Sequence, residues 1–160
     1  MLEKTGVPSK EQIKKSFPDK TLLARPKAIL ECYEDIPCNP CSTSCPFDAI
    51  EIGANINQQP VLKVDLCTGC ALCVPSCPGI AIMTAQIKDH KAVFKIPYEF
   101  LPLPKKGEVW KGLDRYGQAL CEATIEHVLL AKPQDRTAVV TVSVPVEHLY
   151  AFSTIEVKHG

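Results

Sequence analysis

The hydrophobic residues of this chain follow two different patterns along its length. Between residues 27 and 86 they form short runs at residues 28–31, 49–52, 61–64 and 80–84, separated by segments rich in Pro and Gly. Such runs are typical of short strands. The order strand, cysteine-containing loop, strand occurs twice, so we expect an internal repeat in which each half has the same local structure.

Beyond Lys88 the apolar segments are longer and have β character, at residues 92–96, 108–113, 119–128 and 137–144. The last two alternate between apolar and polar positions, as in a strand with one buried face. We expect hairpin turns at residues 113–117 and 132–136. We also expect a stiff Pro-rich connector at residues 97–106 and a helical turn at residues 146–152. We expect a small antiparallel β unit here, in the form of a partly closed barrel.

The first 26 residues are mostly polar. Ser9, with Gln12 three residues later, matches a capping box that opens a short helix, and Pro18 ends that helix after Phe17. We expect this segment to form a surface strap over the cysteine-containing part.

Composition narrows the classes of function. Charged residues make up 22% and the formal net charge is +0, with no basic stripe, which argues against a nucleic-acid-binding protein. Aromatic residues make up only 6%, so we expect a small hydrophobic core. The N-terminal residues have no apolar core of a secretory signal, and no apolar run reaches the ~20 residues of a membrane span. Nine cysteines in such a chain indicate metal ligands and a reducing cytoplasm.

Seven of the cysteines form two related motifs. The second motif is Cys67-x2-Cys70-x2-Cys73-x3-Cys77-Pro78, and the first is Cys38-x2-Cys41-x3-Cys45-Pro46. Three thiolates spaced two residues apart can wrap three corners of one cubane, whereas the fourth thiolate, before Pro, points towards another cluster. Zinc ribbons also use Cys-x2-Cys pairs, but not a run of three cysteines followed by Cys-Pro.

These motifs make residues 27–86 similar to a bacterial ferredoxin with two [4Fe–4S] clusters, which implies a pseudo-twofold arrangement with a cluster at each end. The resemblance also implies that the two motifs exchange their fourth ligands. Cluster 1 is then held by Cys38, Cys41, Cys77 and a fourth residue, and cluster 2 by Cys67, Cys70, Cys73 and Cys45.

The fourth ligand of cluster 1 is open on the sequence alone. The regular spacing places a cysteine at position 35, where this chain has Asp35, and Cys32 lies three residues earlier. Cys32 can reach in, Asp35 can ligate through oxygen, or the corner stays empty and a [3Fe–4S] cluster forms. Thiolate is the softer ligand and suits iron better, so we expect Cys32, although it can also be a simple buried strand residue.

The remaining cysteine and the histidines show no ligand spacing. Cys121 lies on the apolar face of a predicted strand, and we expect a small buried side chain. The four histidines are scattered along the chain, and we expect them at the surface. No constellation for catalysis or nucleotide binding is found, so the chain is not expected to be an enzyme by itself.

A second resemblance extends over the rest of the chain. Residues 31–32, 36–41 and 67–70, with Gly107 and residues 113–117, are similar to the small ferredoxin-like subunits of flavin-dependent dehydrogenases that act on proline, hydroxyproline or sarcosine. This resemblance implies a hetero-oligomer with a flavoprotein dehydrogenase subunit and a possible [2Fe–2S] subunit. Alternatives are a free soluble ferredoxin-like carrier, and a nucleic-acid-binding protein with structural clusters.

The predicted fold class is therefore α+β. We expect a strap at residues 1–26, a two-[4Fe–4S] ferredoxin domain at 27–88 and a small antiparallel β docking domain at 89–160. Because a free ferredoxin has no need of the β tail, we expect the tail to dock a partner. The expected docking surface consists of Tyr98, Phe100, Leu101 and Trp110.

Overall fold

The structure, a computed structural model, describes residues 6–130 and 137–157 and contains two sheets with a few short helices. Its elements are α1 (Lys10–Ser16), the 3-10 helix η1 (Lys20–Ala24), β1 (Lys27–Leu30), α2 (Pro40–Ser44), β2 (Ile50–Glu51), β3 (Val61–Leu62), α3 (Cys73–Ser76), β4 (Ile82–Lys88), β5 (Lys91–Tyr98), β6 (Val109–Asp114), β7 (Ala119–Leu129), β8 (Ala138–Pro145), the 3-10 helix η3 (Val146–His148) and β9 (Phe152–Ile155).

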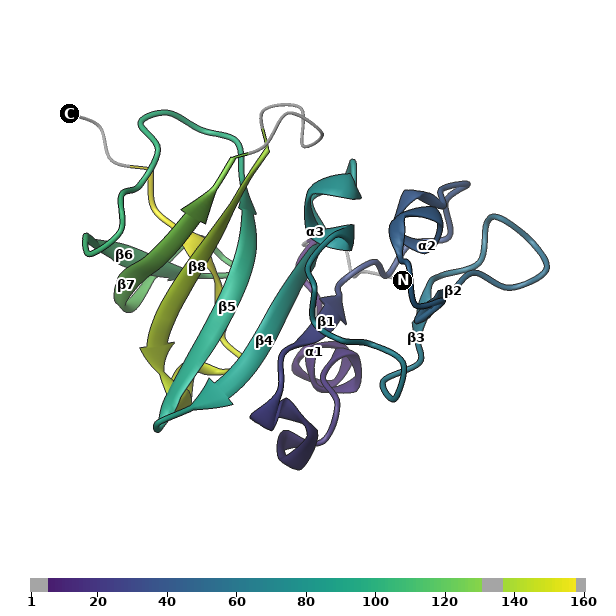
Figure 1. Cartoon of the computed structure of the whole chain (residues 1–160), viewed down its shortest axis with the longest axis horizontal. Coiled ribbons are helices and arrows are strands. Elements are labelled where there is room, and N and C mark those ends of the chain that lie inside the picture. Colours follow the sequence, from purple (N-terminus) through teal and green to yellow (C-terminus); the bar gives the residue numbers. More distant parts are fainter. Residues whose placement is uncertain (1–5, 131–136, 158–160) are drawn as a thin grey trace.

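The larger sheet has seven strands in the order β1-β4-β5-β8-β7-β6-β9, and β2 pairs with β3 in a separate sheet of two strands. Figure 1 shows the large sheet on one side of the molecule, and α2, α3, β2 and β3 on the other. All the pairings are antiparallel. β1 and β4 lie between the two parts and belong to both.

The two faces of β1 and β4 bury different residues. Ala28 and Leu30 pack with the cysteine-containing part, whereas Ile29 and Met83 pack with the large β core. This division follows from the two-residue period of a strand, which sends successive side chains to opposite faces. The cysteine-containing part is therefore built directly onto the edge of the large sheet.

The large sheet continues across residue 88, where the sequence predicts a domain boundary. β4 and β5 form a tight hairpin whose two turn residues, Asp89 and His90, have φ of 52° and 62°. Positive φ at both central residues gives the turn a twist that matches the flanking strands. A division of the chain into domains at residues 88 and 89 stays a prediction, and it coincides with this turn inside one sheet.

The β core is larger than the low aromatic content predicts. Of the twenty buried residues that the structure describes in it, eight are Val or Ile, five are aromatic and four are Ala, most of them on the inward faces of β5, β7 and β8. Phe94 of β5 stacks on Phe152 of β9, with 4.8 Å between the ring centroids. The sheet thus curls until its last strand packs over β5. The expectation of a small core was wrong, because Val and Ile fill much of the core and five aromatic residues are gathered in it.

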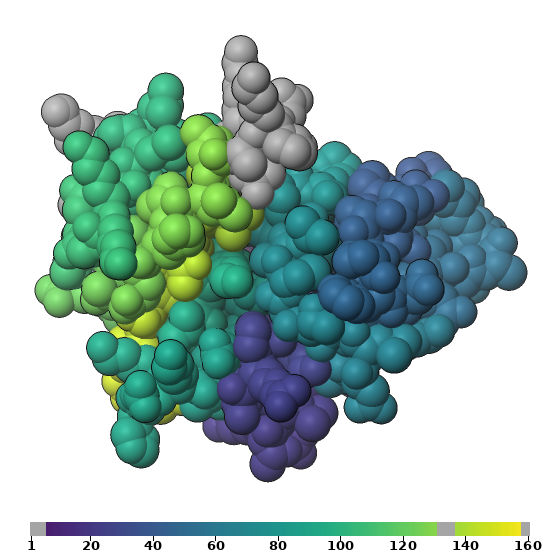
Figure 2. Space-filling model, viewed as in Figure 1, coloured from purple at the N-terminus to yellow at the C-terminus, as the bar shows by residue number. Residues whose placement is uncertain are grey.

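The N-terminal capping box is confirmed. The backbone N–H of Gln12 donates to Ser9 Oγ at 3.2 Å, and the backbone N–H of Ser9 donates to Gln12 Oε1 at 2.9 Å. We expected the strap to lie over the cysteine-containing part, but it also packs on the β core. Its apolar residues Ile13, Phe17 and Leu23 join the β core, because they lie next to the core face of β1 and β4. Figure 2 shows the strap between the two parts.

The expected docking surface on the β tail was half wrong. Tyr98 and Trp110 are each only 2% exposed and belong to the β core, with their ring centroids 6.0 Å apart. Both lie on the inward faces of β5 and β6, so strand alternation buries them. Phe100 and Leu101, which follow β5, are 60% and 78% exposed, as expected.

The remaining local predictions are mixed. The turn at residues 113–117 is confirmed by its position between β6 and β7, and residues 146–148 form a helical turn. The expected turn at 132–136 lies outside the described residues. The connector begins later than expected, since Pro97 belongs to β5. No helix in the described part of the chain has the length and apolarity to span a membrane.

Candidate metal centres

Eight of the nine cysteines surround two separate hollows. The first set, Cys32, Cys38, Cys41 and Cys77, lines a hollow together with Ile36, Pro60 and Pro78. The second set, Cys45, Cys67, Cys70 and Cys73, lines another hollow beside α2 and β1. These are the two groups of four that the sequence predicts, and no cysteine is shared between them. The structure therefore brings together each predicted set, including Cys32.

The second set sits on a loop that is held by the first two residues of β1. The Lys27 ammonium donates to the carbonyl oxygens of Val64 at 3.0 Å and Cys67 at 2.6 Å. The backbone N–H of Ala28 donates to Cys67 Sγ at 3.3 Å. These contacts hold the start of the cysteine run against the sheet, and α3 begins at Cys73.

Gly69 is required in this loop for two reasons. Its φ is +73°, and a Cβ at this position would lie 2.4 Å from the carbonyl oxygen of Pro26. Glycine alone combines this backbone conformation with so close an approach. The residue packs against Pro26 at the end of the strap, so the close approach at Gly69 is made by protein backbone.

Cys45 and Cys77 occupy equivalent places in the two halves. The N–H of Ala49 donates to Cys45 Sγ, and the N–H of Ala81 donates to Cys77 Sγ, both at 3.4 Å. Each of these cysteines precedes a proline, and each faces the hollow of the other motif. The exchange of fourth residues is thus a feature of the backbone path after each Cys-Pro.

The backbone pairing next to these cysteines repeats as well. The N–H of Lys63 donates to the Ala49 carbonyl at 2.7 Å, and the N–H of Glu31 donates to the Ala81 carbonyl at 2.8 Å. β1 pairs with β4 and β2 pairs with β3, so each half closes on a strand of the other. This arrangement is the internal repeat that the short apolar runs predict.

The electrostatic neighbours of three thiols give the same two groups. The pKa of Cys73 is raised to about 12, mainly by burial, with contributions from Cys67, Cys70 and Cys45. Burial also raises the pKa of Cys41, and Cys77, Cys38 and Cys32 add to the effect. The pKa of Cys32 is raised by burial first, then by Cys77. Thiols must be deprotonated to bind iron. The positive charge of the iron ions then offsets the repulsion between neighbouring thiolates.

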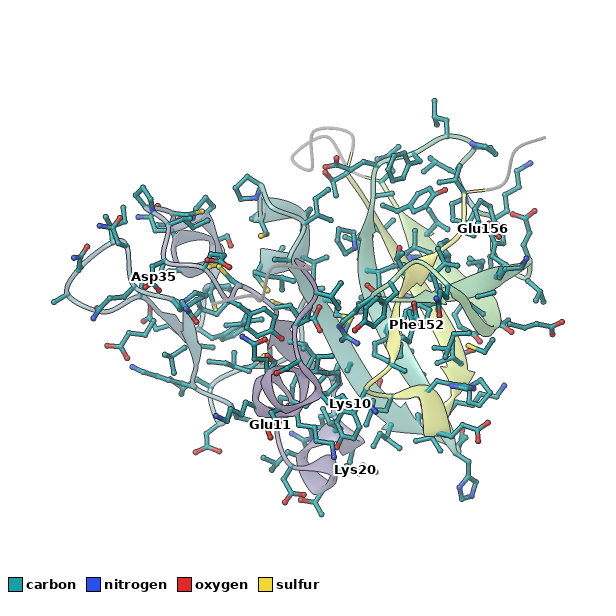
Figure 3. All side chains as sticks on the ribbon, turned by 180° about the vertical axis from the view of Figure 1, so that it is seen from behind. Lys10, Glu11, Lys20, Asp35, Phe152 and Glu156 are labelled. Carbon is teal, nitrogen blue, oxygen red and sulfur yellow. The ribbon has the colours of Figure 1, made fainter. Side chains whose placement is uncertain are left out.

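Asp35 lies near the first set but is held by another partner. Gln59 Nε2 donates to Asp35 Oδ1 at 3.1 Å and to the carbonyl oxygen of Tyr33 at 2.7 Å. Asp35, labelled in Figure 3, is among the charged neighbours that raise the pKa of Cys32. The lining of the first hollow includes Cys32 and not Asp35. The geometry therefore favours Cys32 over Asp35 as the fourth residue of this set.

The donor chemistry of both sets fits iron–sulfur clusters. Each set offers four soft sulfur donors, and N–H groups point at a sulfur in each half, as ferredoxin-type ligation needs. In the described part of the chain, no three Cys, His, Asp or Glu side chains lie close enough together to hold a single ion. Four thiols arranged around a hollow suit a cluster with one sulfur at each corner.

The other candidates lie elsewhere. Cys121 of β7 is half-buried and packs beside the β core, so it belongs to neither set. Among the described histidines, none lines either hollow, and His159 lies outside the described residues. Sequence reasoning missed the Lys27 clamp and an ion pair between Glu31 and Arg115, because neither residue carries a local signal for its distant partner.

A known protein family matches the cysteine-containing part of the chain and the strands that follow it. The family model described as "4Fe-4S dicluster domain" matches residues 36–98. The ferredoxin-type protein NapF of Haemophilus influenzae is 34% identical over 58 residues, 35% of this chain and 33% of that protein. NapF of Escherichia coli K12 is 35% identical over 60 residues, 36% of this chain and 37% of that protein. The chain therefore spans about a third of the length of these relatives.

No solved structure matches the chain. The matched region contains seven of the eight cysteines of the two sets, and Cys32 lies just before it. Similarity to a dicluster domain and two hollows lined by four thiols each lead to the same conclusion. Residues 36–98 are similar to a 4Fe-4S dicluster domain, and the two sets of thiols are the candidate ligands of its [4Fe–4S] clusters.

Proposed function

We propose that this protein relays single electrons through two [4Fe–4S] clusters, one in each cysteine set, as a subunit of a cytoplasmic oxidoreductase complex. The observation that carries the proposal is the division of eight thiols into two disjoint sets around two hollows. A [4Fe–4S] cluster, when bound, accepts and returns one electron. Two such sites in one small domain provide an entry point and an exit point.

The residues around the two sites set how readily each accepts an electron. The N–H groups of Ala28, Ala49 and Ala81 donate to thiolate sulfurs and favour extra negative charge there. Apolar neighbours such as Val74, which is 0% exposed, exclude water from the second site. The chain thus contributes ligation, hydrogen bonds to sulfur and control of water access.

The second set is the more accessible of the two, at the corner formed by Cys70. Cys70 is exposed, whereas Cys67 and Cys73 are buried. Phe47 lines the same hollow and is 44% exposed, and Leu72, close to Cys70 in sequence, is 50% exposed. Exposed apolar residues next to a redox site are suited to a transient electron-transfer contact. We assign the exchange of electrons with a partner to this corner.

A flavoprotein dehydrogenase subunit, together with a [2Fe–2S] subunit, is the proposed partner. A flavin collects two electrons from its substrate and can release them singly, which matches two one-electron sites. Support comes from the sequence resemblance to subunits of amino-acid dehydrogenase complexes and from the exposed Phe100 and Leu101 beyond the matched region. The β core itself is closed around its own aromatic residues.

A free electron carrier is the second candidate. The relatives found are named as ferredoxin-type proteins, and the similarity to them extends over 58 and 60 residues. In this case the same sites would serve exchange with more than one partner. The apparent molecular mass of the protein in native extract distinguishes the two candidates. A subunit migrates with its complex, whereas a free carrier migrates alone.

The experiment that tests the core of the proposal is an iron and sulfide determination on anaerobically purified protein. We expect roughly eight iron and eight sulfide per chain, with a brown colour that dithionite bleaches. Colourless protein with stoichiometric zinc would contradict the proposal. Purification from native extract, with identification of copurifying chains, then tests the flavoprotein partner, and a chain that migrates alone favours the free carrier.

A further inference from the structure

The segment that carries Cys32 has no regular structure of its own. Between the end of β1 at Leu30 and the start of α2 at Pro40 there is neither helix nor strand. Cys32 must nevertheless reach the first hollow from outside the regular cysteine spacing. Local sequence therefore does not fix the position of this thiol, and other contacts have to do so.

Glu31, the residue before Cys32, is held by a nearly buried arginine of the β unit. Arg115 Nε donates to Glu31 Oε1 at 3.0 Å, and Arg115 Nη2 donates to the same oxygen. The two side chains are only 6% and 18% exposed. Arg115 Nη1 also donates to the carbonyl oxygen of Tyr150, so the guanidinium group is fixed from a second side.

The turn that carries Arg115 is held by hydrogen bonds to one side chain. Asp114 Oδ1 accepts the N–H groups of Tyr116 and Gln118, each at 2.9 Å, and Gly117 has φ of +78°. Such a turn holds its backbone through side-chain hydrogen bonds and one glycine. The arginine is thus presented from a fixed point of the large sheet.

Tyr33, the residue after Cys32, is held too. Its hydroxyl group lies 2.7 Å from Ser16 Oγ of α1, and its carbonyl oxygen accepts from Gln59 Nε2 at 2.7 Å. Cys32 therefore lies between two residues that are tethered to other parts of the chain. A buried ion pair adds little stability compared with an apolar pair, so its use here is better explained by positioning.

We propose that Arg115 is a positioning residue for the first metal centre, which acts through Glu31 to hold Cys32 as the fourth ligand. This inference rests on the proposed function, because it requires a [4Fe–4S] cluster in the first set. It assigns to the β unit the task of completing a site that lies in the other part of the molecule. The second set has regular spacing and does not depend on this ion pair.

The test is the variant Arg115→Met in anaerobically purified full-length protein, followed by electron paramagnetic resonance of the oxidised state. A cluster that loses one ligand can lose that iron, and the [3Fe–4S] form that results is paramagnetic when oxidised. We expect a [3Fe–4S] signal in most molecules of Arg115→Met, with the second cluster intact. Arg115→Lys keeps the charge but not the forked hydrogen bonds, and we expect a smaller signal.

The control is Lys111→Gln, which removes a solvent-exposed ion pair from β6, the strand that leads into the Arg115 turn. Lys111 and Glu156 are 3.5 Å apart and are 58% and 54% exposed. We expect no [3Fe–4S] signal from this variant. A combined Cys32→Ala and Arg115→Met variant should give no more signal than Cys32→Ala alone, because the arginine acts through that thiol.

Amide hydrogen exchange gives a second readout, which follows the segment itself. We expect residues 31–38 to exchange at least about tenfold faster in Arg115→Met than in Lys111→Gln. An Arg115→Met protein with both clusters intact and unchanged exchange would overturn the inference, as would equal loss of both clusters. Wild-type protein without two [4Fe–4S] clusters would instead contradict the proposed function, so the two failures are distinguishable.

Discussion

The two cysteine sets are made from related motifs but are held in place in different ways. The second set takes three thiols from one tight run, Cys67, Cys70 and Cys73, and needs only a neighbouring strand to support the loop. The first set takes Cys32 from an irregular segment whose flanking residues are tethered to α1 and to the β6–β7 turn. Regular spacing encodes a site locally, whereas a displaced ligand needs tertiary contacts.

The halves also differ in what occupies equivalent positions. Gly69 stands between Cys67 and Cys70, where Pro40 stands between Cys38 and Cys41. Ile80 and Asp48 lie three residues after Cys77 and Cys45, and both have positive φ, at 55° and 53°. The backbone repeats more faithfully than the side chains, so substitutions at paired positions separate the demands of the fold from those of each site.

The largest expected effect comes from pairs of cysteine substitutions. Cys32→Ala with Cys77→Ala removes two residues of the first set, although Cys77 belongs to the second motif. We expect this protein to keep roughly four iron per chain. Cys45→Ala with Cys77→Ala affects both sets, and we expect iron to fall well below that value. Iron and sulfide determinations after anaerobic purification check both results.

The contrast between these two variants tests the exchange of ligands itself. If Cys77 served its own motif, the pair Cys32 and Cys77 would damage both clusters and the pair Cys45 and Cys77 would also do so. Equal iron content in the two double variants would therefore contradict the crossed sets.

A smaller effect is expected at Gly69. A methyl group there meets the Pro26 carbonyl oxygen at 2.4 Å, and the backbone has φ of +73°. We expect Gly69→Ala to destabilise the protein by about 2–4 kcal/mol, which lowers the unfolding midpoint by about 5–10 °C. Thermal unfolding of the holoprotein, followed by loss of cluster absorbance, checks this value.

Gly79 provides the matched control in the same half. It is exposed, and a Cβ there would meet nothing within 4 Å. Gly79→Ala should shift the midpoint by no more than about 1–2 °C. Similar shifts for the two variants would show that the approach of Pro26 to Gly69 does not constrain the second set.

The smallest expected effect is a gain in stability at Ile80. A β-branched residue at φ of 55° is strained, and Ile80 is 45% exposed, so its side chain loses little by replacement. We expect Ile80→Asn to stabilise the protein by about 1 kcal/mol, since Asn tolerates this conformation. Asp48→Asn at the equivalent position should be nearly neutral. Thermal midpoints of both variants test the difference, and a lower midpoint for Ile80→Asn would contradict it.

Local features of the fold were predictable where short-range rules decide them. The capping box of Ser9 and Gln12 and the hairpin turn at 113–117 depend on residues within a few positions, and both are confirmed. The burial of Tyr98 and Trp110 was missed because a strand's inward face depends on how the sheet curls. The strap was misplaced for the same reason, as its apolar residues follow the core and not the nearest sequence.

The candidate site was predictable to a similar extent. The spacing of Cys67, Cys70 and Cys73 specifies a loop, and the structure groups them with Cys45 as expected. Spacing alone did not decide between Cys32 and Asp35, since both lie within reach along the chain. Gln59, which binds Asp35, and Arg115, which binds Glu31, come from distant segments, so no short-range pattern could identify them.

The most direct test of this account is electron paramagnetic resonance of the oxidised Cys32→Ala and Asp35→Ala proteins, prepared anaerobically side by side. The account predicts a [3Fe–4S] signal in Cys32→Ala, with the second cluster retained, and no such signal in Asp35→Ala. A [3Fe–4S] signal in Asp35→Ala together with two intact [4Fe–4S] clusters in Cys32→Ala would contradict it and assign the fourth ligand to Asp35.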